Sequence, residues 1–153
     1  MATTIKQWSI GVIAKPDLEG FDKIMDTVER RVRAHHKSTV VFGRDLERMD
    51  DYVELMSIAD AVIVFGGDGT LLHVAEIAAL TKTPILGINL GTLGFLTEAP
   101  LDWLDNILQD LLDDKLIEDT RQLLQVKVYK NNKVIRKANF LNDVVINKGT
   151  LSK

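Results

Sequence analysis

The stretch Ala61-Val62-Ile63-Val64-Phe65-Gly66-Gly67-Asp68-Gly69-Thr70 decides the fold. Five apolar residues in a row are typical of a strand that is buried on both faces, and the glycines after them predict a tight turn into a helix. Glycine lets the backbone turn sharply and lets a bulky anion reach the N–H groups without a Cβ in the way. A helix that begins there directs its partially positive N-terminus at the same place. The stretch therefore predicts a phosphate-binding loop that carries one carboxylate.

Strands and helices alternate on both sides of this stretch. We expect strands at 10–14, 39–42, 61–65 and 84–89, and helices at 20–34, 46–56, after Thr70 and at 101–112. Apolar strands that alternate with amphipathic helices predict an α/β fold, an open, mostly parallel Rossmann-like sheet with helices on both faces. Ligands of such sheets bind beside the carboxyl ends of the strands, where both glycine-rich turns, after Phe65 and after Leu90, are expected.

The pattern changes beyond residue 116. Leu124, Val126 and Val128 alternate with polar residues, Asn131-Asn132 offers a turn, and 134–146 is a second extended stretch. This period of two predicts a β-hairpin. We therefore expect an α/β domain with the glycine loop at 1–115 and, at 116–153, the first strands of a β-rich domain. Two strands alone are marginally stable in water, so we expect the chain to be a truncated part of a longer protein.

Composition excludes several classes of protein. The chain has 153 residues, a net charge of −3 and no cysteine, so disulfides and thiolate metal sites are ruled out. The charge gives no reason to expect nucleic-acid binding. Residues 1–6 lack the apolar core expected of a signal peptide, and no apolar stretch approaches the roughly 20 residues of a membrane span. We expect a soluble, cytoplasmic protein without nucleic-acid or membrane partners.

Three stretches together resemble a bacterial-type NAD kinase. They are Gly66-Gly67-Asp68-Gly69-Thr70, the run from Gly87 to Glu98 (Gly-Ile-Asn-Leu-Gly-Thr-Leu-Gly-Phe-Leu-Thr-Glu), and Leu141-Asn142-Asp143-Val144-Val145-Ile146. Residues 119–124 also match a family stretch. Lipid kinases of the diacylglycerol and sphingosine type and phosphofructokinases carry related versions of the first motif. The second and third motifs, in this order and at this spacing, are more specific.

The resemblance implies an activity and an architecture. The activity is transfer of the terminal phosphoryl group of ATP, or of polyphosphate in some members, to the 2′-hydroxyl of the adenosine ribose of NAD, which gives NADP. The architecture is an N-terminal α/β domain followed by an all-β domain, with the active site between them. Members are generally homodimers or homotetramers and need a divalent cation, here expected to be magnesium or manganese.

The glycine loop itself suggests roles for its residues. Asp68 is the candidate base for the ribose hydroxyl, and Gly66, Gly67, Gly69 and Thr70 are the candidate phosphate cradle, with the N–H groups of residues 67–70 as donors. Thr70 is also a candidate helix cap. The loop lacks the lysine of a Walker-type P-loop, and we expect no protein metal ligands because magnesium would sit mainly on nucleotide phosphates. The alternative is that Asp68 only shapes a turn.

Further residues are candidates for binding NAD beside Asp68 and Gly69. The resemblance assigns Asn142 and Asp143 to the adenine and the ribose hydroxyls, against the alternative of a turn at the start of a strand. Phe95 is either an apolar wall of the nucleotide site or a core residue. His73 could reach a phosphate or ribose, or face solvent. Lys153 stands where members often have a basic residue near the substrate.

Two rival functions stay open. The first is a lipid kinase of the diacylglycerol kinase type, against which the second loop continues as Leu93-Gly94-Phe95-Leu96-Thr97. The second is a non-catalytic fragment that binds nucleotide or self-associates, because a Thr-Gly-Ser-Thr-Ala-Tyr-type loop of the family has no counterpart here. We expect NAD kinase activity from the intact protein and little or none from these 153 residues alone.

Overall fold

The computed structural model describes residues 6–14, 18–35, 38–43, 48–91, 94–97 and 99–145. The chain forms two compact units, Met1–Asp119 and Thr120–Lys153, which are described here one at a time. The functional division that the sequence places after residue 115 stays a prediction.

The first unit is an open parallel sheet. Its strands are β1 (Ser9–Ala14), β2 (Thr39–Gly43), β3 (Ala61–Gly66), β4 (Ile85–Asn89) and the two-residue β5 (Ala99–Pro100). They lie in the order β2-β1-β3-β4-β5, and every neighbouring pair is parallel. The helices are α1 (Phe21–Ala34), α2 (Met49–Ile58), α3 (Asp68–Thr81) and α4 (Leu104–Leu112). The predicted α/β class is confirmed.

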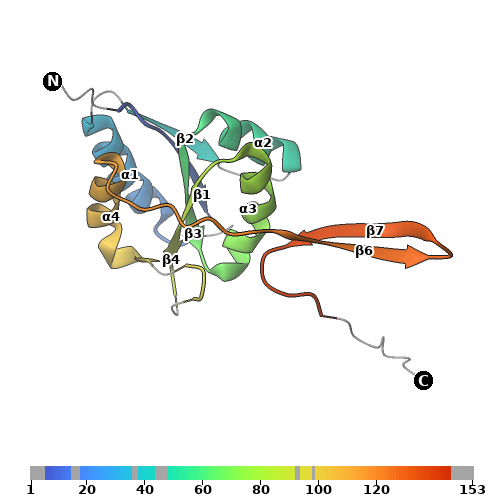
Figure 1. The fold of residues 1–153 in the computed structure, drawn as a ribbon. Helices are drawn as coiled ribbons and strands as arrows, with labels where there is room; N and C mark the ends of the chain where they lie inside the picture. The colour runs from blue at the N-terminus through green and yellow to red at the C-terminus, as the bar shows by residue number, and fades with distance from the viewer. Residues whose placement is uncertain are drawn as a thin grey trace. The chain divides into compact units, whose positions relative to one another are not determined.

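Helices cover both faces of the sheet, with α1 and α4 on one face and α2 and α3 on the other (Figure 1). Strand β3 is buried along its whole length because its side chains alternate between the two layers. Ala61, Ile63 and Phe65 pack with α1 and α4, whereas Val62 and Val64 pack with α2 and α3. The apolar run that decides the fold is therefore the common centre of both cores.

Two helices differ from the expected ranges. Helix α2 begins at Met49 rather than at Leu46, and Met49 is 55% exposed, so its buried side consists of Leu55 and Met56. Residues 44–47 lie outside the described residues. The helix expected at 101–112 begins as a 3₁₀ turn, η1 (Leu101–Trp103), and becomes α-helical at Leu104. Pro100 is the N-cap residue of this turn and has an extended conformation.

The strand order places a topological switch point beside the glycine loop. From β1 the chain passes through α1 to β2 on one side, and from β3 it passes through α3 to β4 on the other. The connections after β1 and β3 therefore diverge at the carboxyl ends of these strands, where open α/β sheets bind ligands. Gly66 is the last residue of β3 and pairs in register with Asn89, the last residue of β4. Both glycine-rich turns thus leave the sheet at the same edge.

The second unit contains the predicted hairpin, with β6 (Leu124–Lys130) antiparallel to β7 (Lys133–Phe140). Asn131 and Asn132 both have positive φ, which is the requirement of a tight two-residue hairpin turn. The expectation that the second strand continues to 146 is wrong for residues 141–145, which are not in a strand. The reason is that Leu124, the first residue of β6, pairs with Phe140, so no strand is left to pair with later residues.

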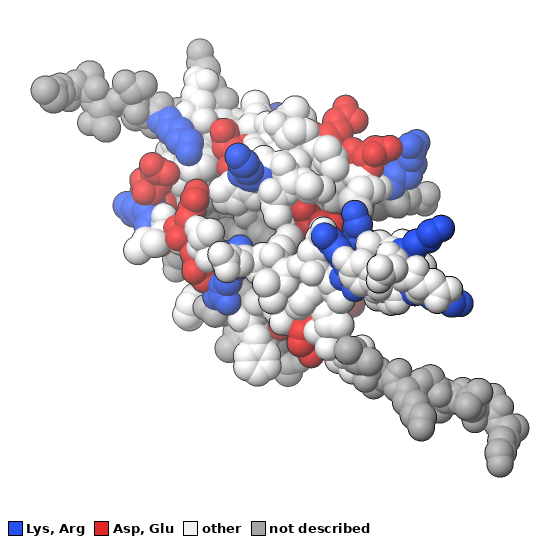
Figure 2. All heavy atoms as spheres, turned by 45° about the vertical axis from the view of Figure 1, so that its right-hand side comes forward, with Lys and Arg blue, Asp and Glu red and all other residues white. Residues whose placement is uncertain are grey.

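Charge is unevenly divided between the two units. Residues 1–119 contain 21 Asp and Glu against 11 Lys and Arg, whereas residues 120–153 contain 8 Lys and Arg against one acidic residue. The hairpin sequence contains five of these cations. Two lysine pairs, Lys127 with Lys137 and Lys130 with Lys133, are directly opposite across the strands. Figure 2 shows Lys and Arg in blue and Asp and Glu in red. The net charge of the whole chain therefore describes neither unit. In the described part of the chain, no helix is long and apolar enough to cross a membrane.

We predict that the centre of β3 is sensitive to the loss of one methylene group. Ile63 is fully buried and Ile58, at the end of α2, is 58% exposed, so the two isoleucines form a matched pair. Ile63→Val should lower the free energy of unfolding by about 0.5–1.5 kcal/mol because it leaves a small cavity. Ile58→Val should change it by less than about 0.5 kcal/mol. Chemical denaturation measures both, and equal effects would contradict the buried position of Ile63.

Candidate phosphate-binding site

The glycine loop turns directly from β3 into α3. Gly67 is the N-cap residue of the helix and makes no side-chain cap, and its carbonyl oxygen accepts hydrogen bonds from the N–H groups of Thr70 (3.0 Å) and Leu71 (3.2 Å). The expectation that Thr70 caps the helix is therefore wrong, because Thr70 lies in the first turn. Its N–H donates to Gly67 in this structure, and its place in the phosphate cradle stays a prediction. Its side chain instead packs on Gly66, where an added Cβ would collide with it.

The other N–H groups of the loop are available for a ligand. The N–H groups of Gly67, Asp68 and Gly69 have no hydrogen-bond partner among the described residues, as expected for the first turn of a helix. A Cβ added to Gly67 or to Gly69 would meet nothing within 4 Å. Packing therefore does not require glycine at these two positions, and the missing side chains leave the donors open. This arrangement suits an anion that approaches the helix N-terminus.

Asp68 joins the glycine loop to the loop that follows β4. Its Oδ2 accepts a hydrogen bond from the N–H of Phe95 (2.9 Å), and its Oδ1 accepts from the N–H groups of Leu96 (3.1 Å) and Thr97 (3.0 Å). The hydroxyl of Thr97 also donates to Oδ1 (3.1 Å). Segments almost 30 residues apart in the sequence are therefore held together by one carboxylate.

These donors lower the pKa of Asp68 below its usual value of 3.8, with the N–H of Phe95 as the largest cause and a smaller opposing effect of burial. Since folding favours the ionised form, the carboxylate stabilises the fold at pH values above its usual pKa. That contribution is lost as the pH falls below 3.8 and through the lowered pKa of the folded state.

Glycine is required where this second loop passes Asp68. A Cβ added to Gly94 would collide with the Asp68 carboxylate. A Cβ added to Gly91, in the same loop, would meet nothing within 4 Å. The alternative that Asp68 only shapes its own turn does not account for its hydrogen bonds, because all of these partners lie in the second loop.

The other candidates of the first unit, Phe95 and His73, are exposed, and Phe95 contacts the carboxylate through its backbone N–H. The side chain of Phe95 is 92% exposed, so the interpretation as a core residue is wrong, while the apolar wall stays a prediction. His73 is exposed and contacts the ring of Tyr52 on α2 edge-on, at 5.5 Å between ring centroids. Five residues of helix turn the chain by about 140° from Asp68, so the two side chains leave different sides of α3.

The candidates of the second unit lie at its carboxyl-terminal side. Asn142 and Asp143 are exposed and follow the end of β7, so the expectation that they lie within a strand is wrong. Their assignment to NAD stays a prediction. Lys153 lies outside the described residues.

Sequence reasoning missed two residues of the site, Asn89 and Thr97. Asn89 is buried at the end of β4, and its side-chain nitrogen donates to the carbonyl oxygen (3.1 Å) and the hydroxyl (3.0 Å) of Thr97. A polar residue that ends an apolar strand is costly to bury without partners, which is a signal for Asn89 that the sequence does contain. No comparable pattern distinguishes Thr97.

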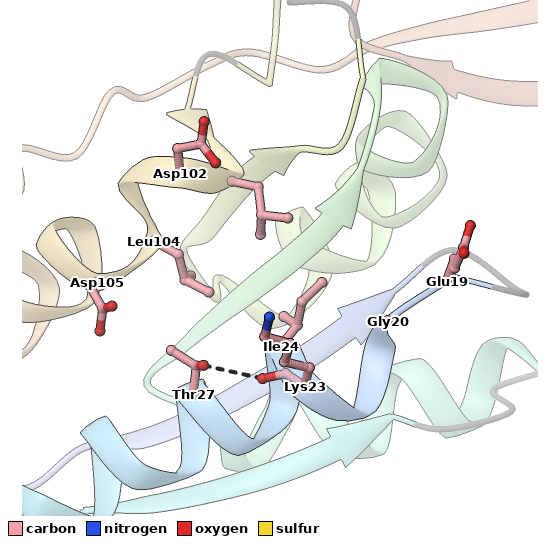
Figure 3. Close-up of a pocket in the computed structure, with 9 residues that line it drawn as sticks. Glu19, Gly20, Lys23, Ile24, Thr27, Asp102, Leu104 and Asp105 are labelled. Carbon is pink, nitrogen blue, oxygen red and sulfur yellow. Dashed lines mark hydrogen bonds between the residues drawn. The ribbon is translucent and has the colours of Figure 1, made fainter.

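A pocket of about 330 Å³ lies elsewhere in the first unit, between the start of α1 and the η1–α4 turn (Figure 3). Its polar lining includes Glu19, Asp102 and Asp105 together with Lys23. Three carboxylates and one ammonium group do not suit a phosphate, and none of the predicted site residues lines this pocket. The open loop surface at the switch point therefore stays the candidate phosphate-binding site.

Fold and loop geometry define the class of protein, a doubly wound α/β protein with open N–H groups in a glycine loop and a carboxylate at its switch point. Residues 52–116 match the family described as the ATP-NAD kinase N-terminal domain. An NAD kinase from Ruminiclostridium cellulolyticum is 34% identical over 149 residues, which are 94% of this chain and 52% of that protein. One from Geobacter sulfurreducens is 46% identical over 96 residues, 63% of this chain and 34% of that protein. The chain belongs to the NAD kinase family.

A solved structure agrees with the fold. Yeast NADH kinase complexed with NADH superimposes with a TM-score of 0.63 at 18% identity, over 89% of this chain and 47% of that one. At this identity the similarity concerns the fold alone. The chain spans about half of this structure and between one third and about half of the two curated relatives.

We predict that Gly94→Ala breaks the link between the two loops. The new Cβ displaces the Asp68 carboxylate, because a side chain rotates more easily than backbone moves, and the N–H groups of Phe95, Leu96 and Thr97 lose their acceptor. Amide hydrogen exchange at these three residues should become several-fold faster. Gly91→Ala, the matched control in the same loop, should leave their exchange unchanged. Equal behaviour of the two variants would contradict the link.

Proposed function

We propose that the intact protein transfers the terminal phosphoryl group of ATP to the 2′-hydroxyl of the adenosine ribose of NAD, giving NADP. The observation that carries the proposal is the single carboxylate of Asp68 beside the open N–H groups of Gly67 and Gly69 at the switch point. Phosphoryl transfer needs donors for the phosphate oxygens and an acceptor for the proton of the attacking hydroxyl. Membership of the NAD kinase family supports the choice of acceptor.

Asp68 suits the role of proton acceptor in spite of its lowered pKa. An ionised carboxylate can orient the hydroxyl from the start, and in a loose transition state the proton leaves late. Polyphosphate as an alternative donor, an oligomeric intact protein and a cytoplasmic location stay predictions.

The divalent cation is proposed to arrive on the nucleotide. Among the described residues no three His, Cys, Asp or Glu side chains gather to hold a metal ion. Mg²⁺ usually keeps several waters and binds through substrate phosphates with few protein ligands, so the residues present fit a cation carried by ATP. There it would neutralise charge on the phosphates, and Mn²⁺ could take the same place.

The rival functions have less support. The curated relatives reported above are NAD kinases, which does not favour a lipid kinase. The second rival, a non-catalytic fragment, concerns only these 153 residues assayed alone. Their low activity stays a prediction. Assaying this chain beside the intact protein tests it directly.

We predict that Asp68→Asn lowers NADP formation by about 100-fold or more, as expected when a general base is lost. The intact protein is incubated with NAD, ATP and magnesium, and NADP is followed with a coupled dehydrogenase. Asp26→Asn, on the exposed side of α1, is the matched control and should keep the wild-type rate. Undiminished turnover in Asp68→Asn would remove Asp68 from catalysis, and diacylglycerol phosphorylation without NADP formation would exclude the proposed reaction.

We predict opposite effects of Gly69→Ala on stability and on activity. Gly69 is in the first turn of α3 and a Cβ there meets open space, so alanine should stabilise the helix by about 0.5–1 kcal/mol or leave it unchanged. The same Cβ would stand where the phosphate approaches, so turnover should fall at least tenfold, an order of magnitude expected for a misplaced substrate. Thermal unfolding and the NADP assay on one preparation separate the two effects. An unaltered rate would remove Gly69 from the phosphate cradle.

A further inference from the structure

Two buried polar side chains stand behind the candidate base. Asn89 is 5% exposed and Thr97 is fully buried, although both carry groups that are costly to bury without partners. Asn89 donates to Thr97 through its amide nitrogen, and its Oδ1 accepts from the N–H of Gly91 at 2.7 Å. The end of β4, the start of its loop and the end of that loop are joined by this one amide.

The hydrogen bonds of this group run in a single direction. An ionised carboxylate only accepts and an amide NH₂ only donates, so the Thr97 hydroxyl must accept from Asn89 and give its proton to Asp68. The Asn89 amide cannot exchange the places of its nitrogen and oxygen, because Oδ1 accepts from the N–H of Gly91 and the nitrogen donates to Thr97. The amide, the hydroxyl and the carboxylate are therefore one ordered unit.

The two oxygens of Asp68 are used differently. Oδ1 accepts three hydrogen bonds, two from backbone N–H groups and one from the Thr97 hydroxyl. Oδ2 accepts only one among the described residues, from the N–H of Phe95. A carboxylate oxygen has about two acceptor directions, so Oδ1 is saturated and Oδ2 has one left. Oδ2 is thus the oxygen that can receive a proton from a substrate hydroxyl.

We propose that Thr97, supported by Asn89, is a positioning residue for Asp68, which pins Oδ1 so that Oδ2 faces the acceptor hydroxyl. The proposal rests on the proposed function, since it assigns a role within that phosphoryl transfer. Thr97 does not touch the reacting atoms and acts through the carboxylate. Its methyl group lies against Gly87, which has no room for a Cβ beside it, so the hydroxyl has a fixed direction.

Thr97→Val and Thr97→Ser separate the hydroxyl from the shape of the side chain. Valine keeps the volume and removes the proton donor, whereas serine keeps the donor and removes the methyl group. In the intact protein, Thr97→Val should lower kcat on the order of 10-fold, the scale expected for a misplaced catalytic group, with the KM for NAD changed by less than about twofold. Thr97→Ser should recover most of kcat.

The pH profile distinguishes positioning from a purely structural role. Hydrogen bonds to the ionised form keep the pKa of Asp68 low, so loss of one donor raises it. The acid limb of kcat/KM should therefore move to higher pH in Thr97→Val and return toward its wild-type position in Thr97→Ser. A valine variant with the wild-type kcat and acid limb, or a serine variant as impaired as valine, would overturn the proposal.

A readout without turnover keeps this test independent of the proposed function. Amide hydrogen exchange at Phe95 and Leu96 should be faster in Thr97→Val than in Thr97→Ser, because the carboxylate that binds both N–H groups is less firmly held. If the wild-type protein makes no NADP, the proposed function fails and the catalytic role of Thr97 fails with it. Unequal exchange in the two variants would then still establish the pinning of Asp68. Should Thr97→Val not fold, Thr97→Ala replaces it as the variant without a donor.

Discussion

The candidate site depends on one electrostatic constraint, the binding of a peptide loop by the carboxylate of Asp68. Three successive N–H groups, those of Phe95, Leu96 and Thr97, point at one side chain that belongs to a different loop. Backbone N–H groups in an irregular segment need acceptors, and an ionised carboxylate is the strongest that a side chain offers. The second glycine loop therefore has a defined path beside the first, although Asp68 and residues 95–97 lie outside the sheet.

This constraint explains why the glycines are not equivalent. Gly66 and Gly94 are required by packing, because a side chain there would collide with Thr70 and with Asp68. Gly67, Gly69 and Gly91 face open space. Gly66 and Gly94 thus shape the site, whereas the other three glycines leave it accessible. The sequence motif alone does not distinguish these two roles, and the three-dimensional structure does.

The sequence predicts four of the five strands of the first unit, whereas the two-residue β5 is not among the expected strands. The clearest case is β3, because burial on both faces requires a continuous apolar run, as in 61–65. The sequence also predicts the position of the glycine loop, since the carboxyl end of a parallel strand is set by topology. Prediction from the sequence fails for features that depend on pairing between residues far apart in the chain. The end of β7 at Phe140 follows from the first residue of β6, and the use of the Thr70 N–H follows from the helix starting at Asp68. The partners of Asp68 lie almost 30 residues away, beyond any local pattern.

The two oxygens of the Asp68 carboxylate accept different numbers of hydrogen bonds, and this difference connects the fold with the proposed chemistry. A carboxylate that only held the second loop would accept the full number of hydrogen bonds on both oxygens. A carboxylate that acted only as a base would be most basic with no hydrogen bond on either oxygen. The observed arrangement is intermediate, with three hydrogen bonds on Oδ1 and one on Oδ2. Pinning one oxygen fixes the direction of the other and lowers the basicity of the carboxylate. In the proposed phosphoryl transfer, the direction of the base would matter more than its basicity. The buried amide of Asn89 and the hydroxyl of Thr97 are the groups that would set the direction of Asp68 Oδ2.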